Sequence, residues 1–177
     1  MTAESRINFI KDWLIKYIKN MPKPATSLVV GVSGGIDSAV VSTICSMTGI
    51  KTFALSMPIK QIKEQDDLSK KHCKWLLTKF KNIEILNINL DEVFTNFEKA
   101  LTKNNSEHAF ANSRARIRMT TLYQVAGSNN GIVVGTGNKV EDFGVGFYTK
   151  YGDGGVDISP IADCTKTEVW EMGKELK

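Results

Sequence analysis

The first twenty residues have the apolar spacing of an amphipathic helix. The apolar positions are Ile7, Ile10, Leu14, Tyr17 and Ile18. Their spacing places them on one helical face, while lysines occupy positions between them. Pro22 and Pro24 follow and are expected to end the helix. Because charged residues interrupt the apolar ones at every turn, the segment is typical of neither a secretory signal nor a membrane span.

Beyond these prolines, short apolar runs alternate with longer segments of helical pattern. The apolar runs predict strands at residues 28–32, 52–57, 83–88 and 131–135. The longer segments predict helices at residues 37–47, 64–79, 93–101, 112–126 and 165–177. Residues 104–108 are expected to form a loop, and residues 136–155 form a glycine-rich segment.

This alternation predicts an α/β, Rossmann-like fold: an open, mostly parallel twisted sheet with helices on both faces. The nearly all-apolar run at residues 28–32 fits a strand that is covered on both sides. Ligands of such folds bind at the carboxyl ends of the strands. The loop that begins at Ser33 and the one that begins at Thr136 are therefore expected at the same edge of the sheet.

Size and composition narrow the class of protein. A chain of 177 residues can bury one core, and we expect a single domain over residues 1–177. The three cysteines form no CxxC pair, which favours a reducing compartment and a soluble, cytoplasmic protein. The net charge of +4 suits a phosphate-bearing ligand as well as nucleic acid, and so decides little.

The sequence GVSGGIDS, residues 31–38, joins the first predicted strand to a helix and allows three interpretations. The first is a hydrolase nucleophile at Ser33, but His72 and His108 do not follow the order of acid and base that such enzymes need. The second is a phosphate loop of glycine amides and a helix N-terminus, without the lysine of a Walker A motif. The third is a helix cap by Ser33 or Asp37, worth about 1 kcal/mol.

Asp37 bears on this choice. A carboxylate about 4 Å from a phosphate costs about 4 kcal/mol per charge pair at an effective dielectric constant near 20. A phosphate loop that contains an aspartate therefore predicts a divalent cation between the two charges. Magnesium is the usual choice where the ligands are oxygens.

The segment SGGIDS, residues 33–38, resembles the SGGxDS loop of the ATP pyrophosphatase superfamily. Further segments read NSRARIRM from residue 112, GIVVGTGNKVE from residue 131 and FYTKYGDGGVDISPIADCTK from residue 147. Together they resemble the NAD synthetase family in order and spacing along nearly the whole chain. The resemblance implies the adenine nucleotide alpha hydrolase-like version of the Rossmann-like fold. It also implies ATP-dependent amidation of nicotinic acid adenine dinucleotide (deamido-NAD) to NAD, the last step of NAD biosynthesis, through an adenylated carboxylate that ammonia attacks.

The resemblance also carries roles onto matching positions. The residues that would bind ATP are Gly31, Val32, Ser33, Gly34, Gly35, Ile36, Asp37, Ser38, Thr136 and Lys166. Asp37 and Glu141 would bind Mg²⁺. Arg116, Lys150 and Asp157 would contact deamido-NAD, with Asp157 as the catalytic candidate that orients ammonia or the nicotinate end. Without the resemblance, the sequence is equally compatible with a structural role for these residues. Arg116 would then lie on a solvent-facing basic helix, Glu141 would be an ordinary loop carboxylate, and Lys150 and Lys166 would be surface lysines.

The resemblance has limits and further implications. This chain has GTGNKVE where many bacterial members have GTDHxxE, which affects the expected contacts of Asn138 and Lys139. The family continues past Lys177, so we expect the single domain to lack its C-terminal part. A homodimer that takes free ammonia is also implied.

Three other functions remain open from the sequence. One is an RNA-thiolating or GMP-forming enzyme of the same superfamily, although RNA thiolation usually brings cysteine pairs. Another is a nucleotide-binding module without turnover. The third is a nucleic-acid surface on the lysine-rich residues 60–81, but no aromatic platform accompanies them and we expect neither a nucleic acid nor a membrane as partner.

Overall fold

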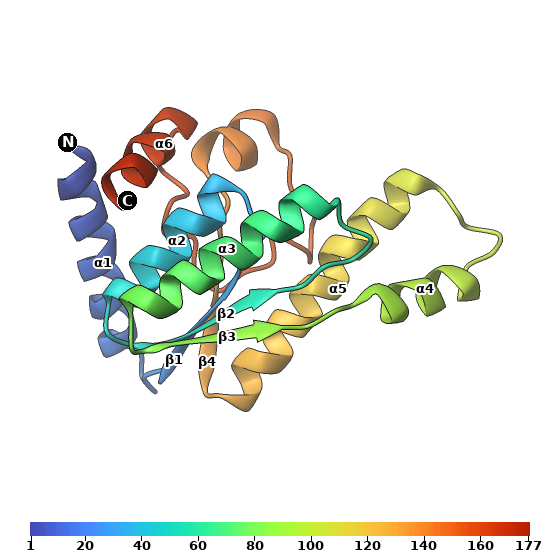
Figure 1. Ribbon diagram of the computed structural model, residues 1–177, viewed down its shortest axis with the longest axis horizontal. Coiled ribbons are helices and arrows are strands. Elements are labelled where there is room, and N and C mark those ends of the chain that lie inside the picture. The colour runs from blue at the N-terminus through green and yellow to red at the C-terminus, as the bar shows by residue number, and fades with distance from the viewer.

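The computed structural model describes residues 1–177, which form one parallel sheet and the helices around it (Figure 1). The strands are β1 (Ser27–Gly31), β2 (Lys51–Ser56), β3 (Ile83–Asn87) and β4 (Gly131–Val134). The helices are α1 (Ala3–Asn20), α2 (Ile36–Met47), α3 (Lys63–Lys79), α4 (Asp91–Ala100), α5 (Glu107–Ser128), the π-helix η1 (Val140–Val145) and α6 (Lys166–Glu175).

The strands lie in the order β3-β2-β1-β4, and all neighbouring pairs are parallel. Val29 of β1 is the register partner of both Phe53 in β2 and Val133 in β4. The chain passes from β1 through α2 to β2, but it reaches β4 on the other side of β1 only after α4 and α5. The direction of strand order therefore changes between β1 and β4, and their carboxyl ends meet where ligands of such sheets bind.

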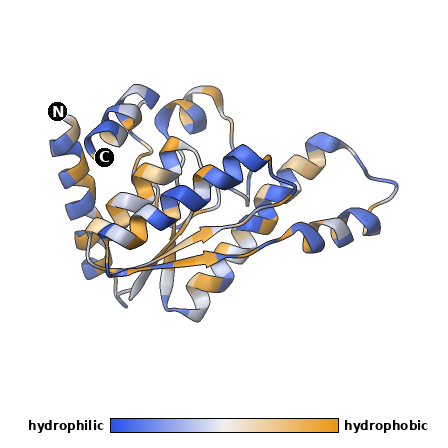
Figure 2. Cartoon of the chain, in the orientation of Figure 1, coloured by the Kyte–Doolittle hydropathy of each residue, from blue (hydrophilic) through white to orange (hydrophobic).

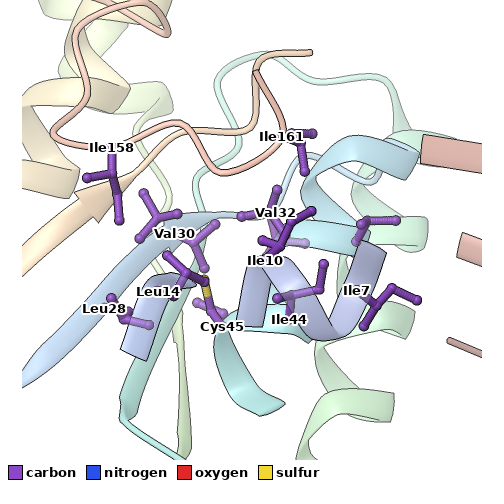
Figure 3. Close-up of a cluster of buried hydrophobic side chains, with 14 of the residues drawn as sticks. Ile7, Ile10, Leu14, Leu28, Val30, Val32, Ile44, Cys45, Ile158 and Ile161 are labelled. Atoms are coloured by element: carbon purple, nitrogen blue, oxygen red, sulfur yellow. The ribbon is translucent and has the colours of Figure 1, made fainter. Parts of the chain in front are cut away.

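Helices cover both faces of the sheet, as the sequence predicts. Alternate residues of a strand point to opposite faces, so β1 contributes to two cores. Leu28 and Val30 lie in the larger core with residues of α1, α2 and α6 (Figure 3). Val29 lies in the smaller core, against residues of α4 and α5. Figure 2 shows the apolar strands between helices whose outer faces are hydrophilic. The α/β fold class is confirmed.

The amphipathic N-terminal helix is confirmed as α1. Its buried residues are Ile7, Ile10, Leu14 and Ile18. Helix α1 packs beside α6, and the two are joined by an ion pair of 2.5 Å between Arg6 and Glu168. No helix of the structure combines the length and apolar character that a bilayer crossing requires.

Two segments differ from the sequence prediction. The predicted loop at residues 104–108 is wrong at its end, because α5 begins at Glu107 and includes His108. The first turn of α5 is stabilised by Phe110, which is buried edge-to-face against Phe94 with ring centroids 5.9 Å apart. The glycine-rich segment contains the π-helix η1, which the apolar pattern did not indicate.

Candidate functional site

The loop between β1 and α2 is a tight turn held by its own serines. The Ser33 amide donates to Ser38 Oγ at 3.2 Å, and Ser38 Oγ donates to the Gly35 carbonyl at 2.9 Å. Gly34 has a φ of +90°, and a Cβ at this position would lie 2.5 Å from the Gln65 carbonyl oxygen of α3. The turn therefore requires glycine at position 34, both for its backbone angle and for the close approach of α3.

The N-terminus of α2 carries no side-chain cap. Gly35 is the capping residue, so no side chain at the N-cap position accepts a hydrogen bond from the first-turn amides. The interpretation in which Ser33 or Asp37 caps this helix is therefore wrong. The amides at the start of an α-helix have no partner within it, and together with the helix dipole they favour an anion. This arrangement supports a phosphate loop.

The hydrolase interpretation of Ser33 has no base to support it. The Ser33 hydroxyl contacts Ser38 Oγ and accepts from the Gly35 amide. His72 instead contacts Ser42 Oγ at 2.9 Å and stacks on Trp75. His108 contacts a neighbouring asparagine of its own helix. Neither histidine can activate Ser33, so a serine nucleophile is excluded here.

Asp37, Glu141 and Lys166 lie together at the carboxyl edge of the sheet. Asp37 is in the first turn of α2, Glu141 is in η1 and Lys166 is the first residue of α6. Lys166 Nζ donates to Asp37 Oδ2 at 2.5 Å and to Glu141 Oε1 at 2.9 Å. The structure thus brings together Asp37 and Glu141, the two predicted metal ligands, and Lys166, a predicted ATP contact, which are far apart in the sequence.

The electrostatics of this cluster follow from its acidic character. Burial lowers the pKa of Lys166, but the hydrogen bonds and charges of Asp37 and Glu141 outweigh burial and leave the pKa raised. Asp142 lies beside them, and burial together with the nearby Asp153, Glu141 and Asp37 raises the pKa of its carboxyl. The site therefore holds more negative than positive charge, which favours a cation.

The donor set fits a magnesium ion that arrives with phosphate. No set of three or more His, Cys, Asp or Glu side chains is arranged to hold a metal by itself. Mg²⁺ usually binds one or two carboxylates and completes its shell with water and substrate phosphates. Asp37 and Glu141 supply two such carboxylates beside the phosphate loop. Asp37 and Glu141 are therefore suitable ligands for a Mg²⁺ ion that binds together with phosphate.

A family profile described as NAD synthase matches residues 6–177. The chain belongs to the NAD synthase family. The NH(3)-dependent NAD(+) synthetase of Mesoplasma florum is 40% identical over an alignment of 171 residues, which covers 93% of this chain and 68% of that relative. The enzyme of the same name from Carboxydothermus hydrogenoformans is 37% identical over an alignment of 179 residues, gaps included, which covers 98% of this chain and 70% of the relative.

Solved structures agree with this assignment. The NH3-dependent NAD synthetase of Campylobacter jejuni, in complex with nitrate, has a TM-score of 0.88 and 32% identity, covering 99% of this chain and 74% of that one. The NMN synthetase of Francisella tularensis has a TM-score of 0.90 and 33% identity, covering 99% of this chain and 71% of that one. The resemblance to the NAD synthetase family and the fold that it implies are both confirmed.

The predicted substrate contacts of this NAD synthase family member form no hydrogen bond with Asp37, Glu141 or Lys166. Arg116 is exposed on α5, and its Nε donates to the Lys150 carbonyl at 3.0 Å. The Lys150 ammonium lies over the Tyr151 ring, 5.1 Å from its centroid. Arg116 and Lys150 are thus brought together, and their assignment to the substrate stays a prediction. Thr136 is half-buried two residues after the end of β4, on the path from the sheet to η1.

Asp157 is held against the outer edge of β4. Its Oδ2 accepts from the Val133 amide at 2.7 Å, and its Oδ1 accepts from the Tyr123 hydroxyl at 3.0 Å. Burial, with the hydrogen bond and charge of Asp157, raises the pKa of Tyr123 to about 12. Both oxygens of Asp157 thus have internal donors, and its catalytic role stays a prediction.

Asn138 is the functional candidate that the sequence did not single out. Its side chain is fully buried, and its Nδ2 donates to Asp37 Oδ1 at 3.0 Å. Its Oδ1 accepts from the amides of Val140 and Glu141, both at 3.1 Å. Asn138 therefore fixes Asp37 and the first turn of η1 at the same time. The only sequence signal was its place in the segment GTGNKVE, where this chain differs from many bacterial members.

Proposed function

We propose that this chain catalyses the ATP-dependent amidation of the nicotinate carboxylate of deamido-NAD with free ammonia, which forms NAD, AMP and pyrophosphate. The observation that carries the proposal is the cluster of Asp37, Glu141 and Lys166 beside an uncapped helix N-terminus. The curated relatives quoted above bear the name NH(3)-dependent NAD(+) synthetase. We place the reaction in the cytoplasm, in a homodimer.

The chemistry takes two steps. In the first, a carboxylate oxygen of the nicotinate ring attacks the α-phosphorus of ATP, and the bond to pyrophosphate breaks. In the second, ammonia attacks the activated carbonyl carbon, loses a proton and displaces AMP. Two polyanions must meet in this reaction, so the site needs amide donors and cations in fixed positions.

The residues divide this work by location. The loop from Gly31 to Ser38 holds phosphate oxygens on its amides and on the hydroxyls of Ser33 and Ser38. Asp37 and Glu141 would hold Mg²⁺, which would supply positive charge to neutralise the phosphates. Lys166 adds a positive charge, its ammonium, at the end of a flexible side chain. Arg116 and Lys150 present two neighbouring cations suited to the phosphates of the dinucleotide.

Product analysis tests the reaction. Purified protein with ATP, Mg²⁺, ammonium and deamido-NAD should form NAD, AMP and pyrophosphate in equal amounts. Release of ADP and phosphate would contradict adenylation. ATP binding without turnover would favour a nucleotide-binding module, and salt-sensitive retardation of bulk tRNA in a gel would revive the RNA-modifying alternative.

The metal assignment has its own variant. Asp37→Asn keeps the shape of the side chain but removes the charge that a hard cation requires. We expect a loss of turnover of about a hundredfold or more, a typical scale for losing a group that stabilises transition-state charge, with little change in thermal stability. Unchanged turnover would show that Asp37 does not bind the metal.

A second candidate substrate is nicotinic acid mononucleotide. The structural similarity to a protein described as NMN synthetase favours it, because the same amidation of the mononucleotide gives NMN. Both substrates present the same carboxylate and differ by the adenylate half. Comparison of kcat/KM for the two at saturating ATP and ammonium decides between them, and we expect the dinucleotide to be preferred.

A further inference from the structure

The ammonium of Lys166 lies between the two carboxylates assigned to the metal. It is 2.5 Å from Asp37 Oδ2 and 2.9 Å from Glu141 Oε1. The Asp37 side chain is only 16% exposed, whereas those of Lys166 and Glu141 are 38% and 42% exposed. The ammonium is therefore the cation that currently neutralises a carboxylate with little access to water.

A magnesium ion would require the same oxygens. Mg²⁺ binds oxygens at about 2.0–2.1 Å, so a small approach of the two side chains would bring both carboxylates onto one ion. The ammonium and the metal cannot occupy this position together. Lysine and a divalent cation are therefore competitors for Asp37 and Glu141.

The position of Lys166 on its helix indicates that the carboxylates hold it there. It is the first residue of α6, whose N-terminus is fixed by a capping box between Thr165 and Glu168. A cation in the first turn of a helix is disfavoured by the positive end of the helix dipole. A lysine here is thus unfavourable for α6 itself, and its partners Asp37 and Glu141 lie on other elements.

We propose that Lys166 is a placeholder for the metal: without nucleotide its ammonium fills the site and keeps free divalent cations out. It leaves the carboxylates when phosphate oxygens are present to receive it, so metal and nucleotide enter together. This inference rests on the proposed function for the identity of the nucleotide. It predicts that metal affinity in the absence of nucleotide is limited by an internal competitor.

The test is a titration with Mn²⁺ alone, which carboxylate sites accept in place of Mg²⁺. Free Mn²⁺ is measured by electron paramagnetic resonance with no nucleotide present. Lys166→Met removes the charge and keeps the length of the side chain. We expect Lys166→Met to bind Mn²⁺ at least about tenfold more tightly than the wild-type protein, because an ammonium no longer competes for the two carboxylates. Equal or weaker binding by Lys166→Met would overturn the proposal.

Matched variants show whether the gain belongs to this site. Lys174→Met changes an exposed lysine of the same helix and should leave Mn²⁺ affinity unchanged. Lys166→Arg keeps the positive charge and should still exclude Mn²⁺. Adding Asp37→Asn to Lys166→Met should abolish the gain, and a gain that persisted would place the metal elsewhere and refute the proposal. If Lys166→Met does not fold, Lys166→Gln serves in the same titration.

A second readout addresses the joint entry of metal and nucleotide. Mn²⁺ bound to protein enhances the relaxation of water protons, which reports the ternary complex. Addition of α,β-methylene ATP should raise the Mn²⁺ affinity of the wild-type protein by a larger factor than that of Lys166→Met. Equal factors would refute joint entry. The Mn²⁺ titration without nucleotide involves no turnover, so a wild-type protein that formed no NAD would refute the proposed function while leaving that competition measurable.

Discussion

Replacement of Asn138 by alanine tests how the two carboxylates of the site are held in place. The substitution removes one hydrogen bond to the charged Asp37 and two to the amides that begin η1. A hydrogen bond to a charged group contributes about 2 kcal/mol and one to an amide about 1 kcal/mol, so the free energy of unfolding should fall by about 4 kcal/mol. With a urea slope of about 2 kcal/mol per molar, the unfolding midpoint should drop by about 2 M.

The same substitution should raise the Mg²⁺ requirement of the reaction. Loss of a partner that orients a metal ligand typically lowers metal affinity about 10- to 100-fold. The Mg²⁺ concentration for half-maximal activity should rise by at least about tenfold. It is measured at fixed ATP, without urea, and at a temperature well below the melting temperature of the variant. The assay is NAD formation across a Mg²⁺ series.

Asn82→Ala is the matched control for this prediction. Asn82 Nδ2 donates to the carbonyls of Ser46 and Ile50 at 2.9 and 2.7 Å, away from the Asp37 cluster. Its loss should reduce stability without changing the Mg²⁺ requirement. An Asn138→Ala protein with the Mg²⁺ requirement of the wild type, or with an unchanged urea midpoint, would refute the role assigned to Asn138.

Three further predictions concern other parts of the structure. Gly34→Ala places a side chain at a φ of +90° against the backbone of α3 and should lower the free energy of unfolding by about 2 kcal/mol or more, which urea titration would reveal. Burial lowers the pKa of His72, so on acidification the histidine is protonated in the unfolded chain before it is protonated in the folded one. The free energy of unfolding should therefore decrease as pH falls below about 6.5. The melting temperature should lose this pH dependence in His72→Gln and keep it in His108→Gln. Tyr123→Phe removes a donor to Asp157 and should lower kcat by about tenfold, equivalent to about 1.4 kcal/mol, and an unchanged kcat would separate this pair from catalysis.

The sheet and most helices could be predicted because their signals are local. Apolar runs bury on a covered strand and apolar spacing of three or four residues buries on one helical face, whatever the rest of the chain does. The local pattern did not predict the first turn of α5, because this turn depends on the contact between Phe110 and Phe94. The local pattern did not predict the π-helix η1 either. Its first two amides donate to the side chain of Asn138, and no repeat of apolar residues marks the segment.

The candidate site was predictable in part for the same reason. The phosphate loop is one continuous segment, so glycines, serines and Asp37 could be interpreted together. The pairing of Asp37 with Glu141 spans more than a hundred residues, and the resemblance to a known family was needed to connect them. Neither the local sequence pattern nor the resemblance to the family indicated that Lys166 bridges both carboxylates, because that contact depends on how α6 packs beside α1 and α2.

The attachment of Asp157 to β4 affects how variants at this position must be interpreted. In this chain β4 is the outermost strand on its side, and the Asp157 carboxylate covers one of its outward amides. An uncovered strand amide can recruit a strand from a neighbouring molecule, which leads to self-association. An Asp157→Ala protein that lost activity through aggregation would imitate a catalytic defect, so its monodispersity in light scattering must be measured beside its turnover.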